Sequence, residues 1–250
     1  MTSTTEKERF IVNVLANARP YMWRENGRAM GPDTDFIREI GKRIGVDFVF
    51  RTVPMKRSLD ELKKGKAHFG VGFRSPEREK FVEYIDKTPL HWSVYRIFVK
   101  HGSPIHYRHV EDLFGKRVGK NRGFSISKNF DQAVNDQKLE VLEADSATQL
   151  ITILLAGRVD AIVGNPASIR KYYRQMIHEE VIYSQAVPVS PQKGSYFLMS
   201  KKARFSDRAV LREKIEKAML EILADGTIEK IEARYPNFVY LQESEQVASE

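Results

Sequence analysis

The sequence predicts an α/β fold with two successive units, each a mostly parallel sheet with helices on its faces. Two patterns indicate this fold. Strand-like and helix-like segments alternate from residue 9 to residue 73, and a second alternation begins near Tyr95. Such alternation is typical of parallel strands linked by helices. With 250 residues, 42% of them hydrophobic, the chain is long enough to fill one large core or two modest ones.

The first unit is predicted to run strand, helix, strand, helix, strand. Residues 9–15 form the first strand, and a loop containing Pro20 and Gly27 follows it. Apolar residues then recur at helical spacing until Gly45, which is the expected helix stop. We expect strands at residues 9–15, 46–53 and 67–73, and helices at residues 33–44 and 55–64.

The second unit repeats the architecture without repeating the sequence. We expect strands at residues 117–119, 139–142 and 161–163, and helices at residues 125–133, 147–156 and 166–177. The chain then returns through the proline-containing segment 187–191 to a strand at 196–199. Two helices complete it, separated by the strong turn pair Asp225-Gly226, with Thr227 as the expected N-cap of the second.

Composition excludes several classes of function. The chain has no cysteine, so disulfides, thiolate nucleophiles and cysteine-ligated metals are excluded. No segment approaches the roughly 18 apolar residues that span a bilayer. The polar start, Met1 to Glu8, contains no signal-peptide core. The net charge is +8, but acids separate the small basic groups, which favours a solvated surface over nucleic-acid binding.

Enzyme motifs are also missing. The six histidines form no His-x-x-x-His pair, and the sequence contains no Gly-x-Ser-x-Gly elbow, P-loop or dinucleotide fingerprint. His106 and His109 lie three residues apart in an expected loop, where solvated side chains are the simpler interpretation than a metal site. We therefore predict no catalytic residue, no metal and no cofactor.

Three segments, in this order and spacing, carry a resemblance. They are Ser75-Pro76-Glu77-Arg78-Glu79-Lys80, the run from Gly157 to Val163, and the helix-turn-helix from Leu223 to Tyr235. Together they resemble the family 3 periplasmic solute-binding proteins, the polar amino-acid receptors of ABC importers. The resemblance covers the chain from about Phe10 to Tyr235.

The resemblance implies two Rossmann-like lobes of the type II periplasmic binding fold, joined by two crossing strands. We expect lobe 1 at residues 1–93 and 190–250 and lobe 2 at residues 94–189. The crossings are expected near 91–94 and 186–194. A ligand would bind in the cleft between the lobes, and closure about the hinge would trap it.

Arg78 is the strongest ligand candidate that the resemblance implies. Family members place an arginine at the end of a Thr-x-x-Arg segment, where its planar fork holds the ligand's carboxylate. Here Ser75 takes the place of the threonine, and Phe73 stands where a serine is common. The alternative is a surface arginine paired with Glu77 or Glu79.

The second lobe is expected to contribute the segment Gly123-Phe124-Ser125, which matches a Gly-Thr-Thr segment of the family. At a helix start its N–H groups would favour an anion; the alternative is an ordinary Ser125 N-cap. Asn165 stands where family members commonly carry an aspartate for the ligand's ammonium. An amide can accept that hydrogen bond but adds no charge.

Four further side chains are candidates for the pocket. Tyr21 matches a family aromatic and Trp23 is a possible second wall, with core packing as the alternative for both. Arg57 and Arg74 are candidates to face the cleft. Several arginines without an acid for an ammonium would favour an anionic ligand, such as a dicarboxylate.

The resemblance therefore implies a monomeric periplasmic protein that captures a small carboxylate-bearing ligand, an amino acid or related organic acid, for an ABC permease in the inner membrane. Two alternatives keep the fold. One is the ligand-sensing domain of a signalling receptor. The other is a dehydratase-like enzyme, which would need a general acid that the sequence does not identify.

Overall fold

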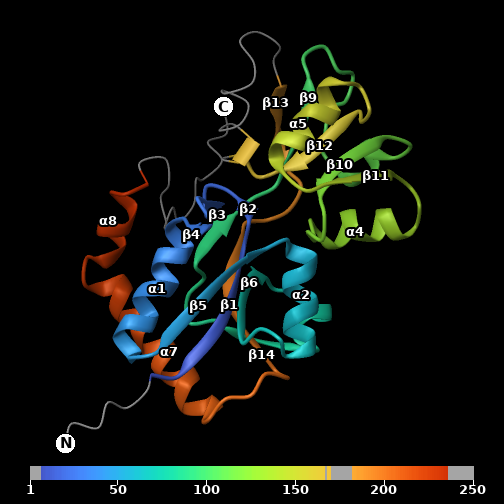
Figure 1. The fold of residues 1–250 in the computed structure, drawn as a ribbon. Coiled ribbons are helices and arrows are strands. Elements are labelled where there is room, and N and C mark those ends of the chain that lie inside the picture. The colour runs from blue at the N-terminus through green and yellow to red at the C-terminus, as the bar shows by residue number, and fades with distance from the viewer. Residues whose placement is uncertain (1–6, 167, 170–181, 236–250) are drawn as a thin grey trace, which may run out of the picture. The chain divides into compact units, whose positions relative to one another are not determined.

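The computed structural model describes residues 7–166, 168–169 and 182–235, and the chain divides into two compact units (Figure 1). Unit 1 comprises Met1–Ala16, Pro20–Trp92 and Gly194–Glu250. Unit 2 comprises Asn17–Arg19 and Ser93–Lys193. Unit 2 is therefore almost continuous in sequence, whereas unit 1 is assembled from separated segments.

Unit 1 is built on a six-stranded mixed sheet. Its strands are β1 (Arg9–Leu15), β5 (Asp47–Val53), β6 (Phe69–Phe73), β7 (Val82–Ile85), β8 (His91–Ser93) and β14 (Lys193–Ser200). The order is β5-β1-β6-β14-β7, and β8 also pairs with β14. Strand β1 is parallel to β5 and β6, while β14 is antiparallel to β6 and β7. The strand that returns late in the chain thus fills the middle of this sheet.

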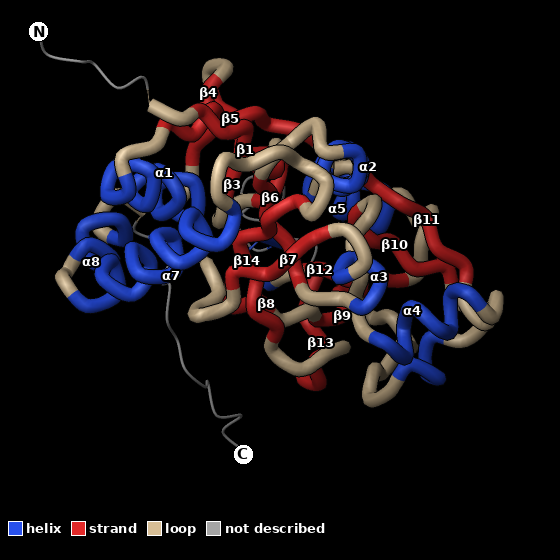
Figure 2. The backbone as a smooth tube through the Cα atoms, turned by 90° about the horizontal axis from the view of Figure 1, so that it is seen from below, coloured by secondary structure: helices blue, strands red, loops and turns tan. Residues whose placement is uncertain are grey.

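Helices cover both faces of the unit 1 sheet (Figure 1). Helices α1 (Pro32–Ile44), α7 (Arg208–Ala224) and α8 (Thr227–Glu232) pack together, as Figure 2 shows. Helix α2 (Met55–Lys64) packs against β1 and β6, and the short α3 (Pro76–Glu79) packs against β7. Fully buried residues such as Phe69 and Phe197, whose rings stack 4.8 Å apart, form the core.

The predicted loop around Gly27 contains a β-hairpin. Strands β3 (Met22–Glu25) and β4 (Arg28–Met30) pair in antiparallel register, and β2 (Asn17–Ala18) precedes them. Asn26 and Gly27 connect the two strands with φ angles of 47° and 75°. An Asn-Gly pair with two positive φ angles is a favoured two-residue hairpin turn, so the sequence did contain the signal for this element.

Unit 2 is built on a five-stranded mixed sheet in the order β11-β10-β12-β9-β13. The strands are β9 (Arg96–Lys100), β10 (Arg117–Asn121), β11 (Glu140–Ala144), β12 (Ala161–Gly164) and β13 (Ile182–Pro188). Strand β10 is parallel to β11 and β12, and β9 is antiparallel to β12 and β13. Helix α5 (Ala147–Leu155) packs on this sheet, and α4 (Lys128–Asn135) packs against the 3-10 turn η1 (Val110–Leu113).

Two predicted helix starts were wrong. The helix expected from Ser125 begins at Lys128, because the Oγ of Ser127 caps it by accepting the N–H of Phe130 at 3.2 Å. The last helix is capped by Gly226, whose φ is 78°, so Thr227 is its first residue. Most of the helix expected at 166–177 lies outside the described residues. Among the described residues, no helix is long and apolar enough to cross a membrane.

Candidate functional site

The predicted ligand residues are divided between the two units. Unit 1 carries Tyr21, Trp23, Arg57, Phe73, Arg74, Ser75 and Arg78, and unit 2 carries Gly123, Phe124, Ser125 and Asn165. In unit 1 most of them lie at the ends of strands or in the first turns of helices. Side chains at such positions are fixed by the neighbouring backbone.

Arg78 is a buried arginine held at the end of β6. Ser75 begins α3 as its N-cap, and its Oγ accepts the N–H of Arg78 at 3.3 Å. The side chain folds back so that Nη1 donates to the carbonyl of Phe73 at 2.8 Å, and the residue is 5% exposed. Gly72 permits this approach, because a Cβ there would lie 3.3 Å from Nη1. Arg78 is thus a buried cation in a fixed orientation, not a solvated surface residue.

Tyr84 on β7 fixes the same turn from the other side. Its hydroxyl donates to the carbonyl of Phe73 at 3.1 Å and accepts the N–H of Ser75 at 3.1 Å. Burial raises the pKa of Tyr84, while the charge of Arg78 acts in the opposite direction. The carbonyl of Phe73 therefore accepts two hydrogen bonds, and the backbone that presents Arg78 is held rigidly.

Tyr21, Phe73 and His91 form an aromatic cluster in unit 1. The rings of Tyr21 and His91 stack with centroids 3.5 Å apart and planes 11° from parallel. Phe73 meets His91 edge-on at 6.3 Å and 82°. The structure therefore brings two predicted ligand residues together on a histidine for which the sequence analysis assigned no role beyond the start of a crossing.

Asp33, in the first turn of α1, anchors that histidine. Its Oδ2 lies 2.7 Å from Nδ1 of His91, and both residues are buried. Its Oδ1 has no hydrogen-bond partner within the described chain. Burial raises the pKa of Asp33, and His91 opposes that rise. A buried acid with a perturbed pKa beside a candidate site is a functional candidate in its own right.

Trp23 packs in a different group of side chains. It is 8% exposed and meets Tyr235 edge-on, with ring centroids 5.7 Å apart. The hydroxyl of Tyr235 donates to Asp35 at 2.8 Å. Burial and this bond to Asp35 raise the pKa of Tyr235 to about 12. Trp23 on β3 therefore packs against Tyr235, three residues beyond the end of α8.

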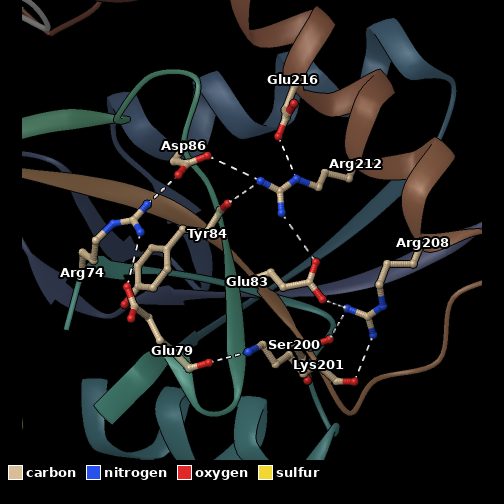
Figure 3. A network of polar contacts seen from close by, with 10 residues as sticks. All are labelled: Arg74, Glu79, Glu83, Tyr84, Asp86, Ser200, Lys201, Arg208, Arg212 and Glu216. Atoms are coloured by element: carbon tan, nitrogen blue, oxygen red, sulfur yellow. Dashed lines mark hydrogen bonds and ion pairs between the residues drawn. The ribbon is translucent and has the colours of Figure 1, made fainter. Parts of the chain in front are cut away.

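Arg57 and Arg74 both have carboxylate partners nearby. Nε of Arg57 lies 2.8 Å from Glu61, and the Arg57 side chain is 66% exposed. Arg74 contacts Asp86 at 2.6 Å and Glu79 at 3.3 Å, and its guanidinium lies over the ring of Tyr84 (Figure 3). Both arginines are more exposed than Arg78, and local acids offset their charges.

The contacts of Arg74 belong to a larger network of polar contacts that joins α7 to β7 (Figure 3). Arg212 reaches Asp86 at 3.4 Å, Glu83 at 3.6 Å and the carbonyl of Tyr84 at 3.0 Å. Arg208 contacts Glu83 at 3.2 Å. The network fixes the C-terminal helix beside the strand that carries Tyr84.

In unit 2, the Gly123-Phe124-Ser125 turn is held by its own neighbours. Gly123 has a φ of 76°, and its N–H donates to Glu143 at 3.4 Å. Lys120 donates both to Glu143 and to the carbonyl of Phe124, each at 3.0 Å. Burial opposes ionisation of Glu143, but Lys120, the N–H of Gly123 and Arg122 together lower its pKa. Ser125 donates to Asp131 of α4 and is not the helix cap.

Asn165 joins the end of β12 to the first residues of unit 2. Its Nδ2 donates to Oγ of Ser93 at 2.7 Å, and its Oδ1 accepts the N–H of Ser168 at 3.2 Å. Both ends of the amide therefore have partners within unit 2. An aspartate at this position could not donate to Ser93 as the amide does.

One groove of the described chain lies away from these residues. A groove of about 540 Å³ between α1 and β5 contains none of the predicted ligand residues; it is lined by Lys7, Arg9, Arg38, Gly41, Lys42, Val46, Asp47, Phe48 and Phe50. No group of three or more metal-ligating side chains occurs within the described ranges.

Residues 10–238 match the model of the bacterial extracellular solute-binding proteins, family 3. The chain belongs to this family. It is 24% identical to the probable amino-acid-binding protein YxeM of Bacillus subtilis, over 90% of this chain and 83% of that protein. It is 26% identical to the histidine-binding periplasmic protein of Escherichia coli K12, over 85% of this chain and 81% of the relative.

A solved structure shows the same fold. An ancestral arginine-binding protein bound to arginine superposes with a TM-score of 0.76 and 26% identity, covering 92% of this chain and 98% of the other. The two-lobed α/β fold of the periplasmic binding proteins is therefore the fold of this family member. YxeM, the histidine-binding protein and the ancestral protein are all amino-acid-binding proteins by name.

Proposed function

We propose that this family member is an extracytoplasmic receptor that captures a small carboxylate-bearing ligand and delivers it to an ABC permease. The observation that carries the proposal is the buried guanidinium of Arg78, fixed by the carbonyl of Phe73. That bond helps to orient the guanidinium. A planar fork in a fixed orientation is suited to a carboxylate.

The remaining ligand contacts in unit 1 would come from the backbone and rings around Arg78. Tyr21 and Phe73 meet at His91 and would pack against the apolar part of the ligand. Arg57 and Arg74 form ion pairs with Glu61, Asp86 and Glu79, so they would contribute less to ligand binding than Arg78.

We propose residues 1–93 and 190–250 as the lobe that holds the carboxylate first, and residues 94–189 as the lobe that completes the site. In the second lobe, the Gly123–Ser125 turn and Asn165 would face the ligand. On ligand binding, the N–H of Gly123 would exchange its hydrogen bond to Glu143, and Asn165 its hydrogen bond to Ser93, for hydrogen bonds to the ligand. A ligand shifts the closing equilibrium only by its differential affinity for the closed form.

The proposed ligand class is an amino acid or a related organic acid. Relatives named for histidine and arginine support an α-amino acid. Asn165 departs from this pattern, because an amide supplies no charge for an ammonium. The class therefore has to be decided by measurement, with amino acids, dicarboxylates and keto acids in the same panel.

The deciding experiment is a thermal-shift screen on protein stripped of ligand by unfolding and refolding, followed by calorimetric titration of each hit. A ligand at about 100 times its dissociation constant adds roughly 2.7 kcal/mol to stability. Arg78→Ala is expected to weaken binding by about 100-fold or more, because it removes one partner of a buried charge pair. Arg78→Lys should also weaken ligand binding, since an ammonium group lacks the planar fork of the guanidinium.

Arg57→Ala is the matched control, because Arg57 is an exposed arginine of the same unit. It should change affinity by less than about tenfold, in keeping with an exposed, screened charge. Urea unfolding of each variant separates loss of binding from loss of folding. Binding that survives Arg78→Ala would remove Arg78 from the site, and the absence of any hit would count against the receptor role.

A further inference from the structure

Asp33 and His91 form a buried titratable pair that the carboxylate contact at Arg78 does not use. Side-chain exposure is 0% for Asp33 and 6% for His91. They come from elements far apart in the sequence, the first turn of α1 and the start of β8. The 2.7 Å contact between them is therefore a tertiary link within unit 1.

The pair lies where the chain passes between units. The chain enters one segment of unit 1 at Pro20, immediately before Tyr21. It leaves this segment after Trp92, the residue that follows His91. His91 stacks on Tyr21 and meets Phe73 edge-on. The His91 ring thus contacts two proposed ligand residues, and His91 is the first residue of the crossing expected at residues 91–94.

The proton count of the pair sets its charge. When Asp33 is protonated, its carboxyl is neutral and lies within hydrogen-bond distance of Nδ1 of His91; when Asp33 is ionised, the buried carboxylate carries a charge. Two groups on the surrounding elements are also titratable or charged: the phenol of Tyr21, which stacks on His91, and the guanidinium of Arg78, which binds the carbonyl of Phe73. The contact with His91 lowers the pKa of Asp33, against the larger effect of burial.

We propose that His91, anchored by Asp33, is a positioning residue that holds Tyr21 and Phe73 in their ligand-binding arrangement and makes that arrangement depend on the protonation of Asp33. The inference rests on the proposed function only for the role of Tyr21 and Phe73. The proton dependence of the local structure follows from the buried pair itself.

The direction of the pH dependence follows from Asp33. Burial raises its pKa above the ordinary value of 3.8, so the folded chain keeps this proton at pH values where the unfolded chain has lost it. The stabilisation is complete below the unfolded value and is lost as pH rises through the folded one. The contacts around His91 should therefore loosen as the solution becomes more alkaline.

The first test needs no ligand. Amide exchange is measured for the peptide spanning residues 89–95, where the N–H of Leu90 donates to Ser195 at 2.7 Å, and is corrected for the intrinsic pH dependence of exchange. In the wild type, protection should be highest below the unfolded value of 3.8 and should fall as pH rises, by about tenfold for each unit by which burial raises the pKa of Asp33. In Asp33→Asn, which keeps the packing but cannot ionise, protection should stay constant.

The second test uses L-arginine and L-histidine as probes and measures affinity across the same pH range. Asp33→Asn should keep the wild-type affinity at low pH and lose its pH dependence. His91→Asn keeps a donor for Asp33 but removes the ring from Tyr21, so its affinity should fall about tenfold at every pH. The exposed His101 provides the matched control, and His101→Asn should behave as the wild type.

The two tests fail separately. Protection that does not change with pH in the wild type, or that changes equally in Asp33→Asn, overturns the inference and leaves the receptor role intact. If protection changes with pH as expected but neither amino acid binds, the result argues against those two ligands and not against the role of Asp33 and His91. Wild-type affinity in His91→Asn would show that His91 does not position Tyr21 and Phe73.

Discussion

At the scale of single residues, the sequence indicated which side chains were candidates for the site, but it did not indicate their burial or their hydrogen-bond partners. Arg78 was identified from its segment, but its burial depends on Gly72 and on the carbonyl of Phe73. Asp33 and His91 are separated by 58 residues, and no local pattern connects them. A lone histidine before a tryptophan carries no signal of a buried partner, so the pair could be found only in three dimensions.

Gly31 provides a residue-scale prediction beside the aromatic cluster. Its φ is 113°, and a Cβ there would lie 2.4 Å from the carbonyl oxygen of Tyr21 and 2.7 Å from Cα of Met22. Gly31→Ala combines a disfavoured backbone with a clash against backbone, so we expect a loss of more than about 2 kcal/mol in the free energy of unfolding. Urea titration followed by circular dichroism measures it.

The control for this prediction is Gly27→Ala. Gly27 also has a positive φ, 75°, but an added Cβ would have nothing within 4 Å. Only the backbone cost of about 1 kcal/mol should appear there. Equal losses at both positions would mean that backbone conformation alone accounts for the effect and that the space around Gly31 has no role.

At the scale of elements, local stop signals decided which predictions were right. The strand β1, the helices α1 and α2 and their glycine ends were confirmed, because Gly45 and Gly65 close each helix with φ angles of 74° and 72°. Strand β8 falls within the crossing expected near residues 91–94, and the short strands β7 and β9 were not predicted. Each is defined by pairing with a distant strand, which periodicity within the segment does not reveal. The Asn26-Gly27 hairpin was missed although its turn signal was present.

The start of α4 gives an element-scale prediction. Ser127, not Ser125, accepts the first free N–H of this helix, that of Phe130. Ser127→Ala should lower the free energy of unfolding by about 1 kcal/mol, whereas Ser127→Asn should change it by a few tenths, because asparagine caps as well as serine. Denaturant unfolding of the two variants compares them directly. Equal losses for both substitutions would place the cap elsewhere.

At the scale of the whole molecule, the α/β alternation predicted two units, and it could not predict how the late segments enter them. Strand β14 lies between β6 and β7, and α7 is fastened to β7 by the arginine network (Figure 3). These contacts join segments more than 100 residues apart. The candidate site was predicted as a set of residue types, while its arrangement depends on such long-range contacts.

Arg212 provides the prediction at this scale. It contacts Glu83, Asp86, Glu216 and the carbonyl of Tyr84, and its side chain is 33% exposed. Arg212→Ala should lower the free energy of unfolding by about 1–2 kcal/mol, since several partners, one of them a backbone carbonyl, lose their donor together. Thermal unfolding at low and high salt measures this loss, and part of it should persist at high salt.

Arg9→Ala is the control for Arg212. Arg9 makes a single ion pair with Asp47, and its side chain is 67% exposed. Exposed pairs of this kind contribute less than about 1 kcal/mol. A loss for Arg212→Ala no larger than that for Arg9→Ala would mean that α7 is held by its apolar face alone.

The place of β14 in the sheet also sets an order for folding during synthesis. Residues 93–193 form nearly all of unit 2, so that unit can complete its sheet while the ribosome is still translating the rest of the chain. The first sheet cannot close until β14 emerges, because β6 and β7 each need it as a neighbour. Until then two strands have open edges, which are templates for pairing with other chains. The polypeptide is therefore most prone to aggregate in the interval before residue 200 leaves the ribosome.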